Sequence, residues 1–308
     1  MRTSGRGLIE DYWGRYVAVL RPEDGRAFVL RDPSGALPCF QREVEGVTVF
    51  FSWLEDLLEF APGVSTPRVN WDAIGALLSI GHLGGHETAL EGILQILPGH
   101  LTPLGSQAAP PVMLWSAAAV ARKQGDEDPE PAAAGLRQAA LDCIGAWSSC
   151  YGRILLRLSG GVDSAILLGA LRTMKPAAEI TCINYHSPGS DSDERGFARL
   201  AAARAGVELV ERERDAAFRL DDILGVSRTP MPEGYTGRLG ANRTDAELAD
   251  ARRAPAMFTG AGGDSLFFQL RCTWPAADYL KRHGLGRGFV RASLDAARLG
   301  RVSLWRSM

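Results

Sequence analysis

The segment that most constrains the fold is an apolar strand that runs through a glycine-rich turn into a helix. Residues 153–158 read RILLRL, the turn 159–164 reads SGGVDS, and residues 164–174 have a helical pattern. A second apolar strand follows at 179–185. A strand, a helix and a strand in this order form a parallel unit, because the helix returns the chain to the edge from which it started. The sequence therefore predicts a parallel sheet, with ligands at the carboxyl ends of its strands.

The second half of the chain continues this alternation. We expect helices over about 132–150 and 193–205 and a further strand at 256–259. The stretch 123–131, KQGDEDPEP, is charged, contains proline and has no periodicity, which is typical of a linker. The sequence therefore predicts two domains, over 1–122 and 132–308, joined by this linker.

The first half has the signals of an antiparallel sheet. Short apolar runs at 16–20, 27–30 and 47–51 are separated by turn-forming clusters of Pro, Gly, Asp and Ser. Residues 71–80 have a helical pattern, and Asn70 stands where a helix N-cap is expected. This half is predicted to be α+β.

Composition excludes several classes of protein. The 308 residues are 46% hydrophobic and 23% charged, and their net charge of −2 gives no reason to expect a nucleic-acid or membrane partner. The first residues lack the apolar region of a signal peptide, and no apolar stretch is long enough to span a bilayer, so a cytoplasmic protein is expected.

Five cysteines without CxxC spacing favour buried thiols over disulfides or zinc. His82 and His86 are four apart, but the glycines between them disfavour a metal-binding helix.

The SGGVDS turn is predicted to bind the phosphates of a nucleotide. Its glycines allow close backbone approach, the start of the following helix favours an anion, and two serines offer hydroxyl donors. The chain has neither GxxxxGK[ST] nor GxGxxG, so the loop is not that of kinases and GTPases, and a dinucleotide is disfavoured. The alternative is a purely structural Gly-Gly turn. The residues predicted to bind ATP or pyrophosphate here are Leu158, Ser159, Gly160, Gly161, Asp163 and Ser164.

A second glycine-rich turn, FTGAGGD at 258–264, also follows an apolar strand. Asp163 and Asp264 would then lie at the same edge of the sheet, where two carboxylates suit Mg²⁺ bound to the β- and γ-phosphates. Thr259 and Gly260 are added to the expected ATP site. The alternative is that each aspartate only caps a helix.

These motifs, in this order, resemble the asparagine synthetase superfamily. The resemblance covers about residues 12–270 and rests on SGGVDS (159–164), TGAGGD (259–264), DERGFAR (193–199), YWGRY (12–16), RDPSGALP (31–38) and LPGH (97–100). It implies a Rossmann-like ATP-pyrophosphatase domain, preceded by a glutamine-amidotransferase-like domain with an Ntn-hydrolase-like fold. It also implies ATP and Mg²⁺ as cofactors and activation of a carboxylate as an acyl-adenylate.

The chain departs from the family's glutamine-dependent members at its start. These open with a cysteine directly after the initiator methionine, whereas here Arg2 follows Met1 and the first cysteine is Cys39. The first domain is therefore expected to be a degenerate glutaminase, and the attacking amine to come from elsewhere. The Gly-Gly-Asp-Ser form of the second turn resembles the lasso-peptide macrolactam synthetases. That resemblance implies a precursor peptide as substrate, with a leader-binding protein and a protease as possible pathway partners.

Two alternatives remain open at this stage: an asparagine synthetase that uses free ammonia, and a non-catalytic ATP-binding protein. The family's helical segment after the second turn carries a lysine near the α-phosphate. Only 44 residues follow Asp264, and their one lysine, Lys281, comes too early. The sequence therefore suggests a member truncated at its C-terminus, and no catalytic residue is assigned.

Overall fold

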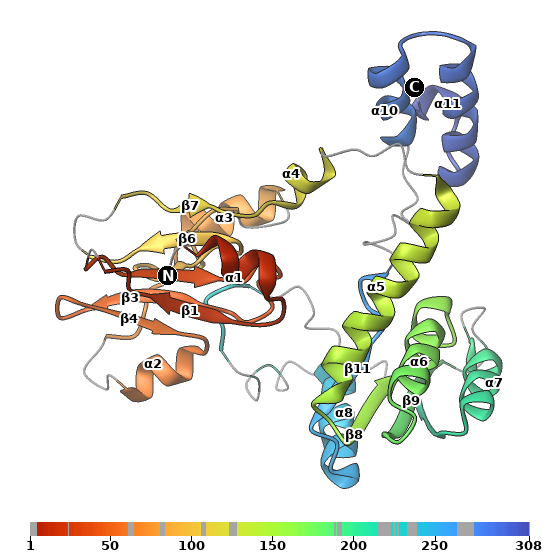
Figure 1. Cartoon of the computed structure of the whole chain (residues 1–308), viewed down its shortest axis with the longest axis horizontal. Helices are drawn as coiled ribbons and strands as arrows, with labels where there is room; N and C mark the ends of the chain where they lie inside the picture. The colour runs from red at the N-terminus through yellow and green to blue at the C-terminus, as the bar shows by residue number, and fades with distance from the viewer. Residues whose placement is uncertain are drawn as a thin grey trace. The chain divides into compact units, whose positions relative to one another are not determined.

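The chain folds into two compact units, made of residues 1–128 with 217–240 and of residues 129–216 with 241–308 (Figure 1). The computed structural model describes residues 5–23, 25–60, 65–80, 84–105, 109–122, 128–187, 189, 193–214, 223, 226, 228–232, 239–263 and 274–307. Among these residues, no helix has the length and apolar character needed to traverse a bilayer.

The unit boundary falls inside the stretch expected to be a linker. Helix α5 (Pro129–Ser149) begins three residues earlier than the expected 132, and a proline in the first turn of a helix loses no hydrogen bond there. The prediction of two domains that follow one another along the chain is incomplete, because residues 217–240 belong to the first unit. Within that unit, the Ala89 amide donates to the Pro230 carbonyl at 3.0 Å and the Arg228 amide donates to Glu55 at 2.8 Å.

The described strands of the first unit are antiparallel, as the sequence indicated, but they form two sheets where one was predicted. One sheet has the order β1-β2-β6-β7 and the other β4-β3-β5. Their strands are β1 (Val17–Leu20), β2 (Phe28–Arg31), β3 (Phe40–Val44), β4 (Val47–Phe51), β5 (Leu94–Gln95), β6 (His100–Pro103) and β7 (Val112–Met113). The helices are α1 (Arg6–Asp11), α2 (Leu54–Phe60), α3 (Trp71–Ile80) and α4 (Ala117–Ala121). The N-cap prediction is confirmed, since Asn70 Oδ1 accepts from the Ala73 amide at 3.1 Å.

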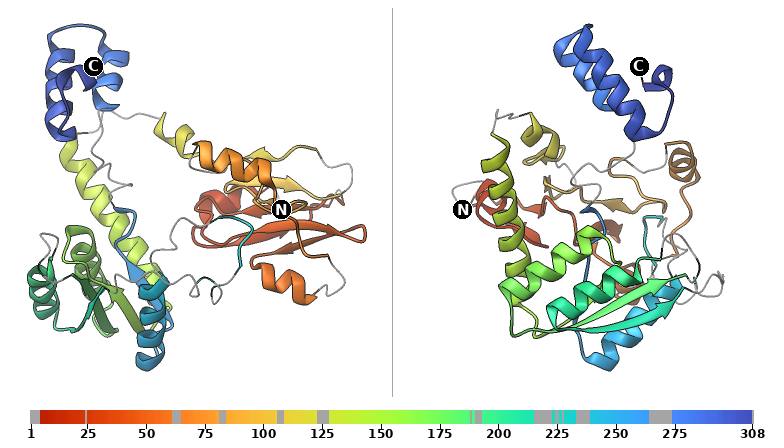
Figure 2. Two further views of the ribbon diagram at one scale, coloured as in Figure 1. Left: turned by 180° about the vertical axis from the view of Figure 1, so that it is seen from behind. Right: turned by 90° about the vertical axis from the view of Figure 1, so that its right-hand side faces the viewer.

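The two sheets of the first unit lie between α1 and α2 (Figure 2). Leu30 of β2 packs toward α1, whereas its neighbour Val29 packs with Phe50 of β4 between the sheets. The outer face of the second sheet packs against α2, with Phe51 and Leu57 in one cluster. Successive residues of a strand point to opposite faces, so each sheet has two buried faces.

The second unit is built on a parallel sheet of order β10-β9-β8-β11. Its strands are β8 (Arg153–Arg157), β9 (Glu179–His186), β10 (Glu208–Glu213) and β11 (Ala256–Thr259). The helices between them are α6 (Val162–Met174), α7 (Arg195–Ala205) and α8 (Leu239–Arg252). The parallel sheet and the mixed α/β class are therefore confirmed.

Both faces of this sheet are covered by helices. Ile154, Leu156 and Cys182 pack in one cluster with residues of α5, α6 and α7, while Leu155 and Ile183 pack against α8. Near-continuous apolar strands are expected when both faces are buried. Further along the chain, α10 (Trp274–His283) and α11 (Arg287–Gly300) pack on one another through Ala276, Phe289 and Ala296, and α12 (Leu304–Ser307) follows.

Strand β10 was not predicted from the sequence. It reads ELVERE and forms the outer edge of the sheet, where charged side chains reach solvent and hide the apolar pattern. Two of its glutamates pair with arginines of neighbouring helices, Glu208 with Arg252 and Glu211 with Arg199.

Candidate functional site

The two glycine-rich turns lie at the point where the direction of strand order reverses. From β8 the sheet extends through β9 and β10 on one side, and β11 pairs with β8 on the other. The turns after β8 and β11 therefore share one carboxyl edge, which is where open parallel sheets bind ligands.

Hydrogen bonds within the first turn fix its shape. The Ser164 hydroxyl is buried, donates to the Gly161 carbonyl at 3.1 Å and accepts from the Ser159 amide at 3.2 Å. The two serine Oγ atoms lie 3.0 Å apart, and the Gly161 amide donates to Ser159 Oγ at 3.2 Å. Ser159 is exposed whereas Ser164 is buried, so the Ser159 hydroxyl is the better placed of the two to meet a ligand.

The glycines of this turn are required by space and by backbone conformation. Gly160 has φ +98°, and a Cβ there would overlap the backbone carbonyl of Glu194. Gly161 is the N-cap of α6, and no side chain caps this end of the helix. The first backbone amides of the helix therefore remain available to an anion. The helix dipole adds a favourable potential for negative charge at this end.

The second turn packs directly on the first. A Cβ on Gly260 would lie 2.9 Å from the Ser164 amide nitrogen, and one on Gly263 would overlap the Asp163 carboxylate. The Thr259 hydroxyl accepts from the Ala261 amide at 3.3 Å and so shapes its own turn. The sequence-based expectation that both turns meet at one edge is borne out by these contacts.

Asp264, the second expected Mg²⁺ ligand, lies outside the described residues. Within the described part of the chain, no group of three or more His, Cys, Asp or Glu side chains is arranged to hold a metal ion. The half-buried Asp163 carboxylate lies next to Gly263, the residue that precedes Asp264 in the sequence. The position of Asp163 is compatible with the metal role, which stays a prediction.

Leu158 contributes to the site through its backbone. Its side chain is fully buried in the core, its amide donates to the Ile183 carbonyl at 2.9 Å, and its carbonyl accepts from Asn184 Nδ2 at 2.7 Å. Asn184 Nδ2 also donates to the Ser159 carbonyl at 3.1 Å. Sequence reasoning missed Asn184, although a lone amide near the end of an apolar strand was a signal that could have found it.

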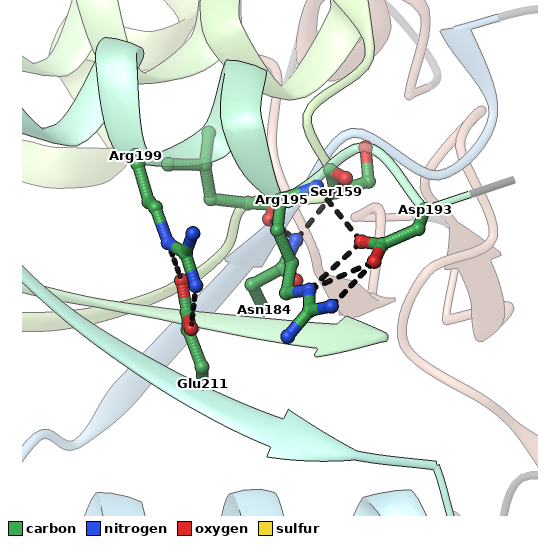
Figure 3. A network of polar contacts seen from close by, with 7 residues as sticks. Ser159, Asn184, Asp193, Arg195, Arg199 and Glu211 are labelled. Atoms are coloured by element: carbon green, nitrogen blue, oxygen red, sulfur yellow. Dashed lines mark hydrogen bonds and ion pairs between the residues drawn. The ribbon is translucent and has the colours of Figure 1, made fainter. Parts of the chain in front are cut away.

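Charged side chains flank the turn on the β9 and β10 side (Figure 3). Arg195 Nε lies 2.9 Å from both carboxylate oxygens of Asp193, and these hydrogen bonds lower the pKa of Asp193 to about 2. Arg199 donates twice to Glu211, at 2.6 and 2.7 Å, and lowers the pKa of that carboxyl group. The backbone of Glu194, at the start of α7, lies against Gly160 of the turn.

Of the three lysines, the structure assigns one a structural role. Lys175 Nζ donates to the carbonyls of Ser148, Ser149 and Tyr151, at 2.6 to 2.9 Å, and so caps the end of α5. Lys281 lies in the last turn of α10, and Lys123 is outside the described residues.

Cys39, in the first unit, is poorly suited to be a nucleophile. It is 3% exposed, and burial raises the pKa of its thiol to about 11. The thiolate is the reactive form of cysteine, so this environment opposes nucleophilic catalysis.

Residues 152–306 match the family model described as asparagine synthase, which covers the strand, both turns and the helices beyond them. The chain belongs to the asparagine synthase family. The SGGVDS turn, which the sequence predicts to bind ATP, lies inside the matched region.

Solved structures share only limited likeness with the chain. They include glutamine-dependent NAD⁺ synthetase from Acinetobacter baumannii in complex with ADP, at 14% identity and TM-score 0.35, covering 82% of this chain and 61% of that one. Others are NH₃-dependent NAD synthetase from Campylobacter jejuni in complex with nitrate ion (15%, TM-score 0.31, 56% and 87% covered) and U34-tRNA thiolase from Methanococcus maripaludis with its [4Fe-4S] cluster (16%, 0.26, 49% and 58%). The chain thus spans about three fifths of the first protein's length, at 61%. No curated protein has a significantly similar sequence.

Proposed function

We propose that this protein is an ATP-dependent ligase that activates a carboxylate as an acyl-adenylate and joins it to an amine of the same peptide, as lasso-peptide macrolactam synthetases do. The observation that carries the proposal is the contact between the two glycine-rich turns, in which the Asp163 carboxylate lies against Gly263 at the start of α6. Membership of the asparagine synthase family supports the ligase class.

In the first step, a carboxylate oxygen of the substrate attacks the α-phosphorus of ATP, the bond to the β-phosphate breaks, and pyrophosphate leaves. The amides at the start of α6 and the Ser159 hydroxyl would bind the phosphates. Asp163 with Asp264 would hold Mg²⁺, whose charge offsets the charge of the leaving pyrophosphate.

In the second step, an amine nitrogen attacks the acyl carbon, the bond to AMP breaks, and the nitrogen loses a proton as the amide forms. The protein's contribution here is to hold the amine close to the acyl-adenylate, because proximity alone lowers the barrier of such a reaction by several kcal/mol.

A peptide amine, rather than ammonia from glutamine, is favoured by the first unit. We propose that this unit is a degenerate glutaminase domain with an Ntn-hydrolase-like fold, consistent with its two sheets between two helices. Its one cysteine, Cys39, is buried and has a raised thiol pKa. The Gly-Gly-Asp-Ser form of the second turn supports the macrolactam type over an asparagine synthetase.

The test is to incubate the full chain with ATP, Mg²⁺ and a peptide whose acidic side chain carries ¹⁸O. Transfer of one ¹⁸O atom to AMP, with pyrophosphate release and loss of water from the peptide, is the expected result. Release of ADP and phosphate would refute adenylation. Pyrophosphate release with free aspartate and ammonia, but not with peptide, would identify an asparagine synthetase instead, and no product with either would leave a nucleotide-binding protein without ligase activity.

A further inference from the structure

A buried side-chain amide beside the SGGVDS turn has an unused hydrogen-bond acceptor. Asn184 is 2% exposed, and both of its polar atoms are close to the turn that follows β8. Nδ2 donates to the carbonyls of Leu158 and Ser159, whereas Oδ1 is buried and has no hydrogen-bond partner among the described residues. Because carbonyl oxygens only accept, these two bonds fix the orientation of the amide and leave Oδ1 as the free end.

An unpaired acceptor in this position needs an explanation. Leaving a buried polar group unpaired costs about 1–3 kcal/mol, and native proteins leave few such groups. Two residues further along β9, on the same face of the strand, His186 Nδ1 is also buried without a partner in the described part of the chain. Both unpaired atoms therefore belong to residues at the carboxyl end of β9, and one of these residues, Asn184, contacts the SGGVDS turn directly.

The side of the turn on which Asn184 lies matters for what it can bind. The start of α6 and the Asp163 carboxylate, which meets Gly263, lie on the side of β11. Asn184 lies on the opposite side, on β9, and contacts the turn through the Leu158 and Ser159 carbonyls (Figure 3). If the phosphates of a nucleotide bind at the start of α6, its nucleoside can extend toward the β9 side, where Asn184 lies.

The chemistry of ATP shows which of its two halves, the phosphates or the nucleoside, can pair with Asn184 Oδ1. At neutral pH the phosphate oxygens only accept hydrogen bonds, so they cannot pair with Oδ1. The hydrogen-bond donors of ATP are the exocyclic amine of adenine and the two ribose hydroxyls, and all belong to the nucleoside.

We propose that Asn184 Oδ1 accepts a hydrogen bond from the nucleoside half of the bound nucleotide, so that Asn184 is a specificity-determining residue of the ATP site. This inference rests on the proposed function, since it takes ATP as the ligand of the SGGVDS turn. The same side chain then links nucleoside recognition to the shape of the turn, because Nδ2 holds the Leu158 and Ser159 carbonyls.

The test combines removal of donors from the ligand with removal of the acceptor from the protein. Affinities of the full chain are measured by calorimetry for ATP, purine riboside 5′-triphosphate, 2′-deoxy-ATP and 3′-deoxy-ATP. The first analogue lacks the exocyclic amine, and the others each lack one hydroxyl. The wild type should bind one of these analogues on the order of tenfold more weakly than ATP, the effect of one hydrogen bond. Asn184→Leu should bind ATP and that analogue equally.

The matched control is Asn242→Leu, which removes an exposed amide whose Oδ1 accepts from Arg157 Nη2 at 2.9 Å on the α8 side of the sheet. Discrimination should survive in this variant. If Asn184→Leu weakens all four ligands and inorganic pyrophosphate by one common factor, the residue only shapes the turn, and the inference is wrong. Equal binding of all four ligands by the wild type would also overturn it, whereas failure of the wild type to bind ATP would refute the proposed function itself.

A second measurement does not depend on the folding of a variant. The ¹³Cγ resonance of Asn184 in the labelled wild type should shift on addition of ATP and stay in place on addition of pyrophosphate. A shift with both ligands, or with neither, would contradict a hydrogen bond from the nucleoside.

Discussion

Gly263 lies against the carboxylate of Asp163, so close that a Cβ on Gly263 would overlap the carboxylate oxygens. The two residues are 100 positions apart in the sequence and follow different strands. Their contact means that the second turn limits the space open to the Asp163 carboxylate.

Gly263→Ala should therefore impair the reaction more than the fold. The added methyl group must push the Asp163 carboxylate aside, and a displacement of about 1 Å in a catalytic group can lower the rate on the order of 100-fold. The measurement is kcat for pyrophosphate release. Gly169→Ala in α6 is the control, since a Cβ there meets nothing within 4 Å and alanine favours a helix. Equal activity of the two variants would show that the contact is unimportant.

Gly160→Ala should lower both stability and ATP affinity. Alanine at φ +98° is strained, and its Cβ would also overlap the Glu194 carbonyl. Gly206→Ala separates the two effects, because Gly206 has φ +63° but open space around its Cβ position. The control should cost only the backbone strain, about 1–2 kcal/mol of unfolding free energy, and keep ATP binding. Chemical denaturation and calorimetry measure both quantities.

Asp163→Asn should abolish Mg²⁺-dependent pyrophosphate release while keeping the shape of the turn. The substitution removes one charge with little change in size, so binding of ATP without Mg²⁺ should be retained. A loss of more than about 100-fold in rate, or roughly 2.7 kcal/mol in the barrier, is expected for a carboxylate that holds the metal. Asp142→Asn, at an exposed position of α5, should have no effect. Retained activity in Asp163→Asn would rule out the metal role.

Alkylation at pH 8 should divide the cysteines that the structure describes into two groups. Burial raises the pKa of the Cys39 and Cys182 thiols, to about 11 and about 12, so both remain protonated and shielded at this pH. Cys143 and Cys150 are exposed and should react with iodoacetamide in the native protein. Mass spectrometry before and after denaturation shows which cysteines react in the native protein and which react only after unfolding. Rapid labelling of native Cys39 would contradict its burial and reopen the question of a nucleophile in the first unit.

Asp245→Ala should destabilise the second unit strongly. Asp245 is 4% exposed, its carboxylate accepts from Arg157 Nε at 2.7 Å and from the Tyr185 hydroxyl at 2.8 Å, and its loss leaves the arginine without its charge partner. Breaking a buried pair costs about 3–5 kcal/mol, compared with about 0–1 kcal/mol for a surface pair. Glu179→Ala, which breaks the exposed pair with Arg153, is the control. Similar free energies of unfolding for the two variants would show that the Asp245 network contributes little.

Local pattern was enough to predict most elements that carry the site. The apolar run after Arg153, the glycines at 160 and 161 and the helix that follows are all readable within 22 residues, because strand, turn and helix preferences act between near neighbours. The same holds for β9 and β11, whose residues 179–185 and 256–259 were predicted as strands. Strand β10 was missed because its charges follow from its place at the sheet edge, which no local window reveals.

What only the tertiary structure decided is which of these elements meet. The pairing of β11 with β8 brings Gly263 to Asp163, and the pairing of β9 with β8 brings Asn184 to the Leu158 and Ser159 carbonyls. Strand order and register depend on how the apolar faces of distant segments pack together, and the sequence pattern of each strand alone is compatible with several neighbours. The sequence by itself therefore determined that a glycine-rich turn, predicted to bind phosphate, joins a strand to a helix, and the packing of the sheet determined which side chains surround it.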